Sequence, residues 1–442
     1  MKITLLVVVA AAALTLAGCG RDAPDGARGP VEIDMTQHDN GAWTIEYDYA
    51  APVREIDFGP SLGDYRARMW RADNGVFVVE SGRDIFRLLN DARAEAVTFT
   101  ATPGLADISK GYQPFAPMGE GAVLIYTGHI IPFTEGRRMR ATLSIEPAGA
   151  NHVAAFGVRD DGFANWESPY RHPAFIYAGA GQAEDNGAYA LTAAEATPDW
   201  ITQETSRLAP RLVEGFTAVF ARALPTEPEL YLTWRGADEP GRLFYKGDAL
   251  PGQVLISLAG GGWRDDSAKA REIFQRATAH ETAHLWQVEA RPVSDAVPNW
   301  IHEGGADALA AEAMVAAGLW DGADQRRDFT AARAACARAT AGRTLLAAEA
   351  AGDWRAAYAC GHVLTVIAAG EAGPGAFWRE LVRRAATNGG YDERLFLELA
   401  GETVGEAAAG AIALATRTAE ARPDLALDRL AELAAAGDKP GD

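Results

Sequence analysis

The sequence predicts an α+β protein with an N-terminal β-sandwich, a central α/β domain and a C-terminal α-helical domain. Three observations support this fold class. Apolar and polar residues alternate from Trp43 to Tyr49, which is the period of a half-buried strand. From about residue 195, helical spacing alternates with short apolar runs. Beyond residue 326 the chain is rich in alanine and keeps a helical pattern.

The first part of the chain has the pattern of a series of short strands. Apolar runs recur between turns that contain Gly, Pro and Asp, and such spacing is typical of an all-β sandwich. We therefore expect residues 31–190 to form a β-sandwich domain. After Trp43 to Tyr49, the runs cover residues 76–79, 97–101, 123–126, 143–145 and 175–177.

The central part, residues 191–325, is expected to combine helices and strands. A helical pattern begins near residue 195, and Pro210 is expected to split it, because proline lacks the N–H of a helical hydrogen bond. A third predicted strand leads into Gly260-Gly261-Gly262, which fits either a plain turn or a sheet edge that pairs with an extended peptide. The predicted strands are 230–234, 242–245 and 254–258.

A predicted helix with Ser267 as its N-cap carries the strongest chemical signal. It places His280 and His284 four residues apart on one face, with the carboxylate of Glu281 beside them. Catalytic zinc takes three protein ligands and leaves a fourth position open. After 18 intervening residues, Glu303 follows in a second predicted helix and supplies a third ligand. The pattern predicts one zinc ion per chain, held by His280, His284 and Glu303.

A second carboxylate is placed to support this site. Asp307 lies four residues after Glu303 and therefore on the same helix face. There its carboxylate can accept a hydrogen bond from a ligand histidine and hold that imidazole in the correct tautomer. The alternative is an exposed helical Asp that makes an ordinary surface contact.

This pattern resembles the gluzincin metallopeptidases, in which HExxH is followed by a gap and a Glu, with Asp307 placed as in the thermolysin pattern. The gap and residues 300–306 are most similar to the aminopeptidase N and leukotriene hydrolase family, and Leu285-Trp286 is similar to the glycyl aminopeptidase family. The resemblance implies a thermolysin-like fold for the central domain. The chain departs from the family in one respect. No Gly-x-Met-Glu-Asn strand motif, whose Glu binds the free amine of the substrate, precedes His280.

The resemblance continues at residues 358–361, which are similar to the Tyr-x-x-Gly segment of the aminopeptidase N family. It implies that Tyr358 donates a hydrogen bond to the oxyanion of the reaction. Without the resemblance, a half-buried core tyrosine would be the default interpretation.

These roles together predict a zinc metallopeptidase that acts on peptide or protein substrates. Zinc lowers the pKa of a bound water from about 15.7 towards 7, and Glu281, which is not a ligand, can take the proton of that water. The alternative is a catalytically silent, zinc-containing lipoprotein that acts as a binding or scaffold protein of the cell envelope. The presence of Glu281 argues against it, because a structural zinc site needs no base.

The first 19 residues of the chain predict export and anchoring. Residues 1–18 follow a positive start with an uncharged, mostly apolar stretch, and Leu16-Ala17-Gly18-Cys19 resembles a bacterial lipoprotein signal. We expect cleavage before Cys19, lipidation of that cysteine and a linker over 19–30. Gly20 after the cysteine implies the outer membrane in Gram-negative lipoproteins, with the protein facing the periplasm.

An α-helical domain is expected over 326–436 and a polar tail over 437–442.

The cysteine content and the net charge limit the possible disulfides and partners. Apart from Cys19, only Cys336 and Cys360 remain, and either a disulfide between them or two buried thiols fits the sequence. The net charge is −19 and no basic cluster occurs, which excludes nucleic acid as an expected partner.

Overall fold

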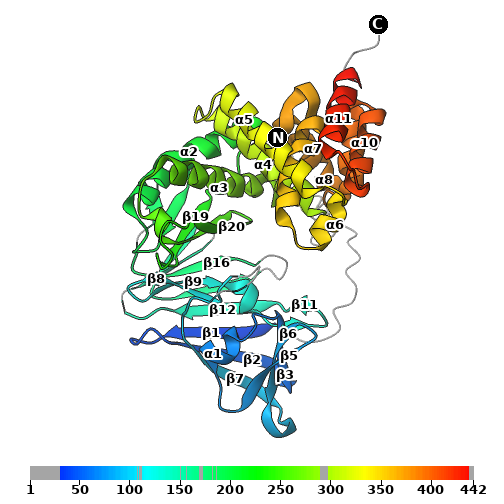
Figure 1. Ribbon diagram of the computed structural model, residues 1–442. Helices are drawn as coiled ribbons and strands as arrows, with labels where there is room; N and C mark the ends of the chain where they lie inside the picture. The colour runs from blue at the N-terminus through cyan, green and yellow to red at the C-terminus, as the bar shows by residue number, and fades with distance from the viewer. Residues whose placement is uncertain are drawn as a thin grey trace, which may run out of the picture.

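A computed structural model describes residues 30–106, 108, 112–149, 151–155, 157–168, 173–181, 183–185, 187–288 and 297–437. The predicted signal segment 1–18, Cys19 and residues 438–442 of the predicted tail lie outside this range. Figure 1 shows β-sheets at one end in blue and cyan, a mixed sheet with long helices in green, and a helical array in yellow to red. The α+β class is confirmed. No helix in the described ranges has the length and apolar character of a membrane span.

Three sheets share one apolar core in the N-terminal part, for which the sequence predicted a β-sandwich. Ile45, Phe58 and Ile125 come from the three different sheets and meet in the same buried cluster. In spatial order, the strands of the first sheet are β15 (Ala164–Ser168), β12 (Ala141–Glu146), β1 (Val31–Gln37), β2 (Trp43–Val53), β7 (Ala94–Ala101) and β4 (Trp70–Arg71). Those of the second sheet are β11 (Arg137–Arg138), β10 (Phe133–Thr134), β3 (Glu55–Pro60), β6 (Arg83–Leu88) and β5 (Gly75–Glu80). Those of the third sheet are β14 (Val158–Asp161), β13 (His152–Ala155), β16 (Phe175–Gly179), β9 (Ala122–Tyr126) and β8 (Phe115–Gly119). A short helix, α1 (Tyr65–Met69), precedes β4.

The third sheet is buried on both faces, which explains the unbroken apolar runs in β9 and β16. One face packs into the sandwich core through Ile125. The other face carries Phe175 and packs against Leu255 of the central sheet. The side-chain amide of Gln253 also bonds both to the N–H and to the C=O of Phe175, each at 2.8 Å, as a neighbouring strand would. The third sheet therefore fixes the central sheet to the sandwich.

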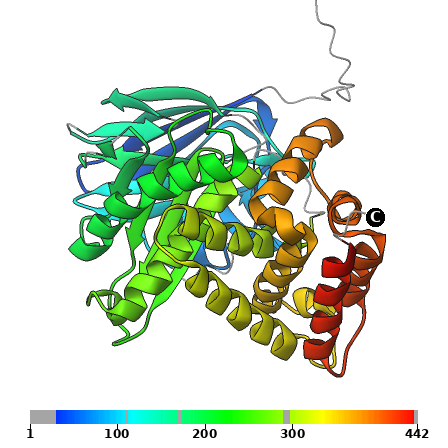
Figure 2. The same cartoon turned by 90° about the horizontal axis from the view of Figure 1, so that it is seen from above.

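The central sheet is mostly parallel and has an antiparallel edge strand. Its order is β17 (Glu184–Asp185), β18 (Ala190–Ala193), β19 (Glu229–Trp234), β21 (Gln253–Ala259) and β20 (Phe244–Leu250). β18, β19 and β21 run parallel, whereas β20 is antiparallel to β21. Helices α2 (Asp199–Phe220) and α3 (Ala268–Gln287) cover the face opposite the third sheet, and Figure 2 shows them from above in green.

Two expectations for this region are wrong. Pro210 does not split a helix, because it lies inside the continuous helix α2. A proline inside a helix lowers stability by about 3 kcal/mol. The burial of Leu212 and Phe216 on the same helix offsets this loss, since each such buried side chain stabilises the fold by about 1.5–3 kcal/mol. The strand predicted at 242–245 starts only at Phe244, because Arg242 still belongs to the preceding turn, in which its N–H bonds to Glu239.

The glycine run 260–262 is a turn and not a peptide-binding edge. β21, which leads into it, lies between β19 and β20, so both of its edges are paired. Residues Gly261–Trp263 form a single 3-10 turn. Of the described strands of this sheet, β17 and β20 lie at its two ends, and β20 is the free edge on the β21 side.

In the described range 297–437, eight α-helices continue the core that begins under the central sheet. Buried residues from Tyr189 to Ala434 form one cluster. The expected domain boundary between 325 and 326 lies inside helix α5, and the one between 190 and 191 lies inside β18. The helices are α4 (Asn299–Ala316), α5 (Gly322–Ala339), α6 (Leu345–Ala350), α7 (Trp354–Ala369), α8 (Gly373–Asn388), α9 (Glu393–Val404), α10 (Glu406–Arg417) and α11 (Pro423–Gly437).

Helices α4 and α7 cross in direct backbone contact. A Cβ atom added to Gly361 would lie 1.8 Å from the Trp300 carbonyl oxygen, and one added to Gly304 would lie 2.2 Å from the Gly361 Cα. Only glycine permits this approach. A disulfide between Cys336 of α5 and Cys360 of α7 secures the other side of α7.

We expect Gly361→Ala to lower the free energy of unfolding by about 1–3 kcal/mol or more, because the new methyl group overlaps the α4 backbone. Urea unfolding followed by circular dichroism measures the change.

The matched control is Gly410→Ala in the exposed face of α10, where a Cβ atom meets nothing within 4 Å. There alanine should stabilise by about 0.5–1 kcal/mol through helix propensity. Equal unfolding curves for the two variants would contradict the backbone contact.

Candidate metal centre

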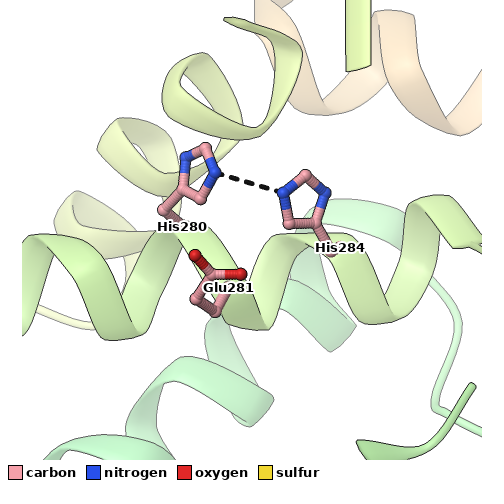
Figure 3. Close-up of side chains that lie close together, drawn as sticks. All are labelled: His280, Glu281 and His284. Atoms are coloured by element: carbon pink, nitrogen blue, oxygen red, sulfur yellow. Dashed lines mark hydrogen bonds between the residues drawn. The ribbon is translucent and has the colours of Figure 1, made fainter. Parts of the chain in front are cut away.

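Helix α3 presents the two predicted histidines as the sequence pattern indicates. Ser267 is its N-cap, and the Ser267 side chain accepts a hydrogen bond from the Ala270 N–H. His280, Glu281 and His284 are only 5–6% exposed. Figure 3 shows the two imidazoles on one side of α3, joined by a dashed line, with Glu281 beside them.

Helix α4 brings Glu303 to the same place. It begins after Pro298, and the carboxylate of Glu349 accepts a hydrogen bond from the Trp300 N–H at 2.7 Å. That acid satisfies a free backbone donor and interacts favourably with the positive end of the helix dipole. From this fixed start, Glu303 faces α3 one turn later.

Three ligand atoms converge at the spacing that zinc requires. His280 Nε2 lies 3.1 Å from His284 Nε2 and 3.2 Å from Glu303 Oε2, and His284 Nε2 lies 3.5 Å from the same oxygen. Bonds of about 2.1 Å at tetrahedral angles separate zinc ligand atoms by about 3.4 Å. The residues therefore fit one zinc ion.

The outer nitrogens of both imidazoles are already engaged. His280 Nδ1 pairs with Asp307 Oδ1 at 2.9 Å, and His284 Nδ1 pairs with Gln287 Oε1 at 2.7 Å. The Gln287 amide is oriented by its own donation to the His302 carbonyl at 3.2 Å. Both acceptors favour a proton on Nδ1, so each Nε2 atom is left to face the shared position between the two rings and Glu303. A cation bound there would replace the proton that the metal-free site holds.

Glu281 lies next to the ligand atoms without taking a ligand position of its own. One of its oxygens is within 4.8 Å of a nitrogen of each imidazole. Gly247 of the edge strand β20 packs against it, because an added Cβ atom there would lie 2.2 Å from Glu281 Oε1. Burial raises the pKa of Glu281 to about 8, and the charges of Glu303 and Asp307 add to the effect of burial. A carboxylate in this setting accepts a proton readily.

Tyr358 lies on α7, and its ring stacks on His280 at 5.3 Å between centroids. Burial raises the pKa of Tyr358, and the Glu303 and Glu281 carboxylates raise it further. The hydroxyl therefore keeps its proton at neutral pH and can donate it in a hydrogen bond. The crossing of α4 and α7 holds Tyr358 and Glu303 in a fixed relation.

The site also contains several residues that the sequence patterns do not single out. Gln287, three residues after His284, could have been found from helical spacing, and so could Arg276, four residues before His280. His302 stacks on His284 at 4.4 Å and its Nδ1 bonds to the Tyr391 hydroxyl at 2.6 Å. Its contact with His284 depends on the packing of α4 on α3, which no local pattern reveals.

Asp248 is a further carboxylate near the site and comes from the edge strand β20. Burial raises the pKa of its carboxyl group to about 8, and the negative charge of Glu281 acts in the same direction. Only the pairing of β20 on the free edge of the sheet brings it here, so the sequence alone did not identify it.

Several solved structures share the fold of this chain. An aminopeptidase N family protein from Idiomarina loihiensis superposes with a TM-score of 0.64 at 12% identity, over 90% of this chain and 78% of that one. An M1 zinc metallopeptidase variant bound to a Tyr-Ser-Ala substrate, from Deinococcus radiodurans, gives 0.51 at 15% identity, over 89% and 94%. A two-domain M1 zinc metallopeptidase variant bound to L-arginine gives 0.54 at 16% identity, over 90% and 95%.

The agreement with these structures is one of fold, and at that level it confirms the resemblance found in the sequence. No protein-family model matches the chain. No curated protein matches it either.

Zinc binding is expected to tighten as the pH rises. Although burial lowers it, hydrogen bonds to Asp307 and Glu303 raise the pKa of His280 well above its ordinary value. Zinc must displace that proton, so below the raised pKa the affinity should fall by about tenfold for each pH unit. Competition with a chromophoric chelator between pH 5.5 and 7.5, corrected for the protonation of the chelator, measures it. An affinity that stays constant over this range would contradict the assignment of His280.

Proposed function

We propose that this chain is a zinc-dependent peptidase, with His280, His284 and Glu303 as the metal ligands. The observation that carries the proposal is the convergence of two Nε2 atoms and one carboxylate oxygen within 3.5 Å, with both Nδ1 atoms engaged by acceptors. The shared fold with M1 zinc metallopeptidases supports it.

Zinc held by these ligands would supply a Lewis acid that polarises the peptide carbonyl and lowers the pKa of water. The protein residues supply the proton transfers. Glu281 lies beside the metal position and is not a ligand, so it can take a proton from the attacking water and pass it to the leaving amine. Burial raises the pKa of Glu281 to about 8 in the metal-free chain, so a proton received there is held more firmly than on a solvent-exposed carboxylate.

Tyr358 is placed to stabilise the negative charge that develops on the carbonyl oxygen. Its ring lies on His280, next to the metal position, and its raised pKa keeps the hydroxyl protonated. A hydrogen bond that strengthens as charge develops lowers the barrier more than one made equally to the substrate.

A buried Glu281 favours turnover over a silent zinc-binding scaffold. A structural zinc site gains nothing from an unpaired carboxylate, and desolvation of that group costs free energy. Proteins keep such an unfavourably buried carboxylate where it must take up and release a proton. Carboxylates with a perturbed pKa therefore cluster at catalytic sites.

We expect Glu281→Gln to keep its zinc and to lose hydrolysis of a peptide library by at least about a hundredfold, because the amide cannot accept the proton of the water. Zinc is measured by elemental analysis of the purified protein, and cleavage by mass spectrometry. Glu272→Gln, about two and a half turns earlier on α3, is the control and should keep both its zinc and its hydrolysis. Undiminished cleavage by Glu281→Gln would exclude Glu281 as the base. The cleavage profile also separates removal of terminal residues from internal cutting.

Tyr358→Phe is expected to lower kcat by about 10²–10³-fold with little change in KM, because it removes one donor aimed at the transition state. The ring and its contact with His280 remain. Steady-state kinetics on the best peptide from the library measures both constants. A rise in KM with kcat unchanged would assign Tyr358 to substrate binding instead.

We further propose that Cys19 carries a lipid anchor that holds the protein at the outer membrane, facing the periplasm. The proposal rests on the signal-like segment before Cys19. In a Gram-negative host, the full chain should take up radiolabelled palmitate and sediment with outer membranes. Cys19→Ala should abolish both. Labelling of the Cys19→Ala variant would contradict lipidation at this residue.

A further inference from the structure

Arg276 lies between two carboxylates at one side of the metal centre. It is on α3, one turn before His280. Its Nη2 is 3.5 Å from Asp307 Oδ2, and its Nε is 3.3 Å from Asp328 Oδ1. Because Asp307 is on α4 and Asp328 is on α5, one guanidinium joins three helices. We call Arg276, Asp307 and Asp328 the carboxylate clamp.

The clamp reaches the metal centre through Asp307. One oxygen of Asp307 accepts the hydrogen bond of His280 Nδ1 at 2.9 Å, and the other faces Arg276. The direction of the Asp307 carboxylate is therefore fixed from both sides. Both acids of the clamp are only 12% exposed, so water screens their mutual repulsion poorly.

Asp328 has little freedom to move away from Asp307. Its Oδ2 lies 3.7 Å from Nδ1 of the buried His362 on α7, four residues after Tyr358. If the guanidinium were absent, two carboxylates would face each other without a cation between them. The group that can turn is then Asp307, and turning would break its bond to His280.

We infer that Arg276 is a positioning residue that keeps the Asp307 carboxylate aimed at His280, and that it thereby sets how tightly the chain holds its metal ion. The inference rests on the proposed zinc site. Loss of the hydrogen-bond partner of a metal-bound histidine lowers metal affinity by about 10–100-fold. Arg276 touches neither the metal position nor a ligand, and it acts only through Asp307.

The test compares two Arg→Gln variants on the same helix. Arg276→Gln should weaken zinc binding by about 10–100-fold, measured by chelator competition on the full chain. Arg271→Gln is the matched control. Its side chain is 36% exposed against 40% for Arg276, and it pairs with Glu204 and Asp266 away from the metal. It should leave zinc affinity unchanged even if it lowers stability. Arg276→Lys, which keeps the charge, should lose less affinity than Arg276→Gln.

A double variant separates positioning from a general structural role. Adding Asp328→Asn to Arg276→Gln removes the repulsion that turns Asp307, so zinc affinity should return most of the way to that of the unmodified protein. Equal affinity in Arg276→Gln and the unmodified protein would overturn the inference, and so would a double variant no tighter than Arg276→Gln. If the unmodified protein itself binds no zinc, the proposed function is contradicted as well. This outcome differs from the other two, in both of which the unmodified protein binds zinc.

Discussion

The site depends on holding three electron-rich atoms within 3.5 Å of one another in a buried place. Helix α3 can supply only the two imidazoles, because its spacing sets them on one face. The carboxylate must come from α4, and the position of α4 is set by its contact with α7 at Gly304 and Gly361. One crossing of two backbones therefore determines where Glu303, the proposed third ligand, lies and where α7 presents Tyr358.

The residues that we propose as ligands could be brought together from the sequence because their positions follow from local periodicity. A cap at Ser267 and a spacing of four residues define one face of α3, and a second helix start at Pro298 defines where Glu303 lies on α4. Gly247 and Asp248 could not be found in this way. They reach Glu281 only because β20 pairs with β21 on the free edge of the sheet, and strand order is a property of the whole domain.

The same distinction holds for the fold. Alternation in β2 indicates a strand with one buried face, and the structure shows that pattern. The unbroken apolar runs of β9 and β16 indicate burial on both faces, but they do not say what covers the second face. That partner is the central sheet, through contacts such as Phe175 with Leu255. At Pro210 a prediction from a local pattern is wrong. Proline disfavours a helix, but the burial of Leu212 and Phe216 stabilises helix α2 across this position.

The charges around the site explain how so many acids can be buried together. Glu303, Asp307 and Asp328 carry three negative charges, and Arg276 carries one positive charge. A divalent cation would make these three acids and the guanidinium neutral in sum. Glu281, whose pKa is raised to about 8 in the metal-free chain, would add one further negative charge when it is ionised. In a poorly solvated place that charge costs free energy, so the ionised carboxylate favours taking up a proton. The arrangement that would stabilise the metal ion is thus also the one that suits Glu281 to the proposed role of base.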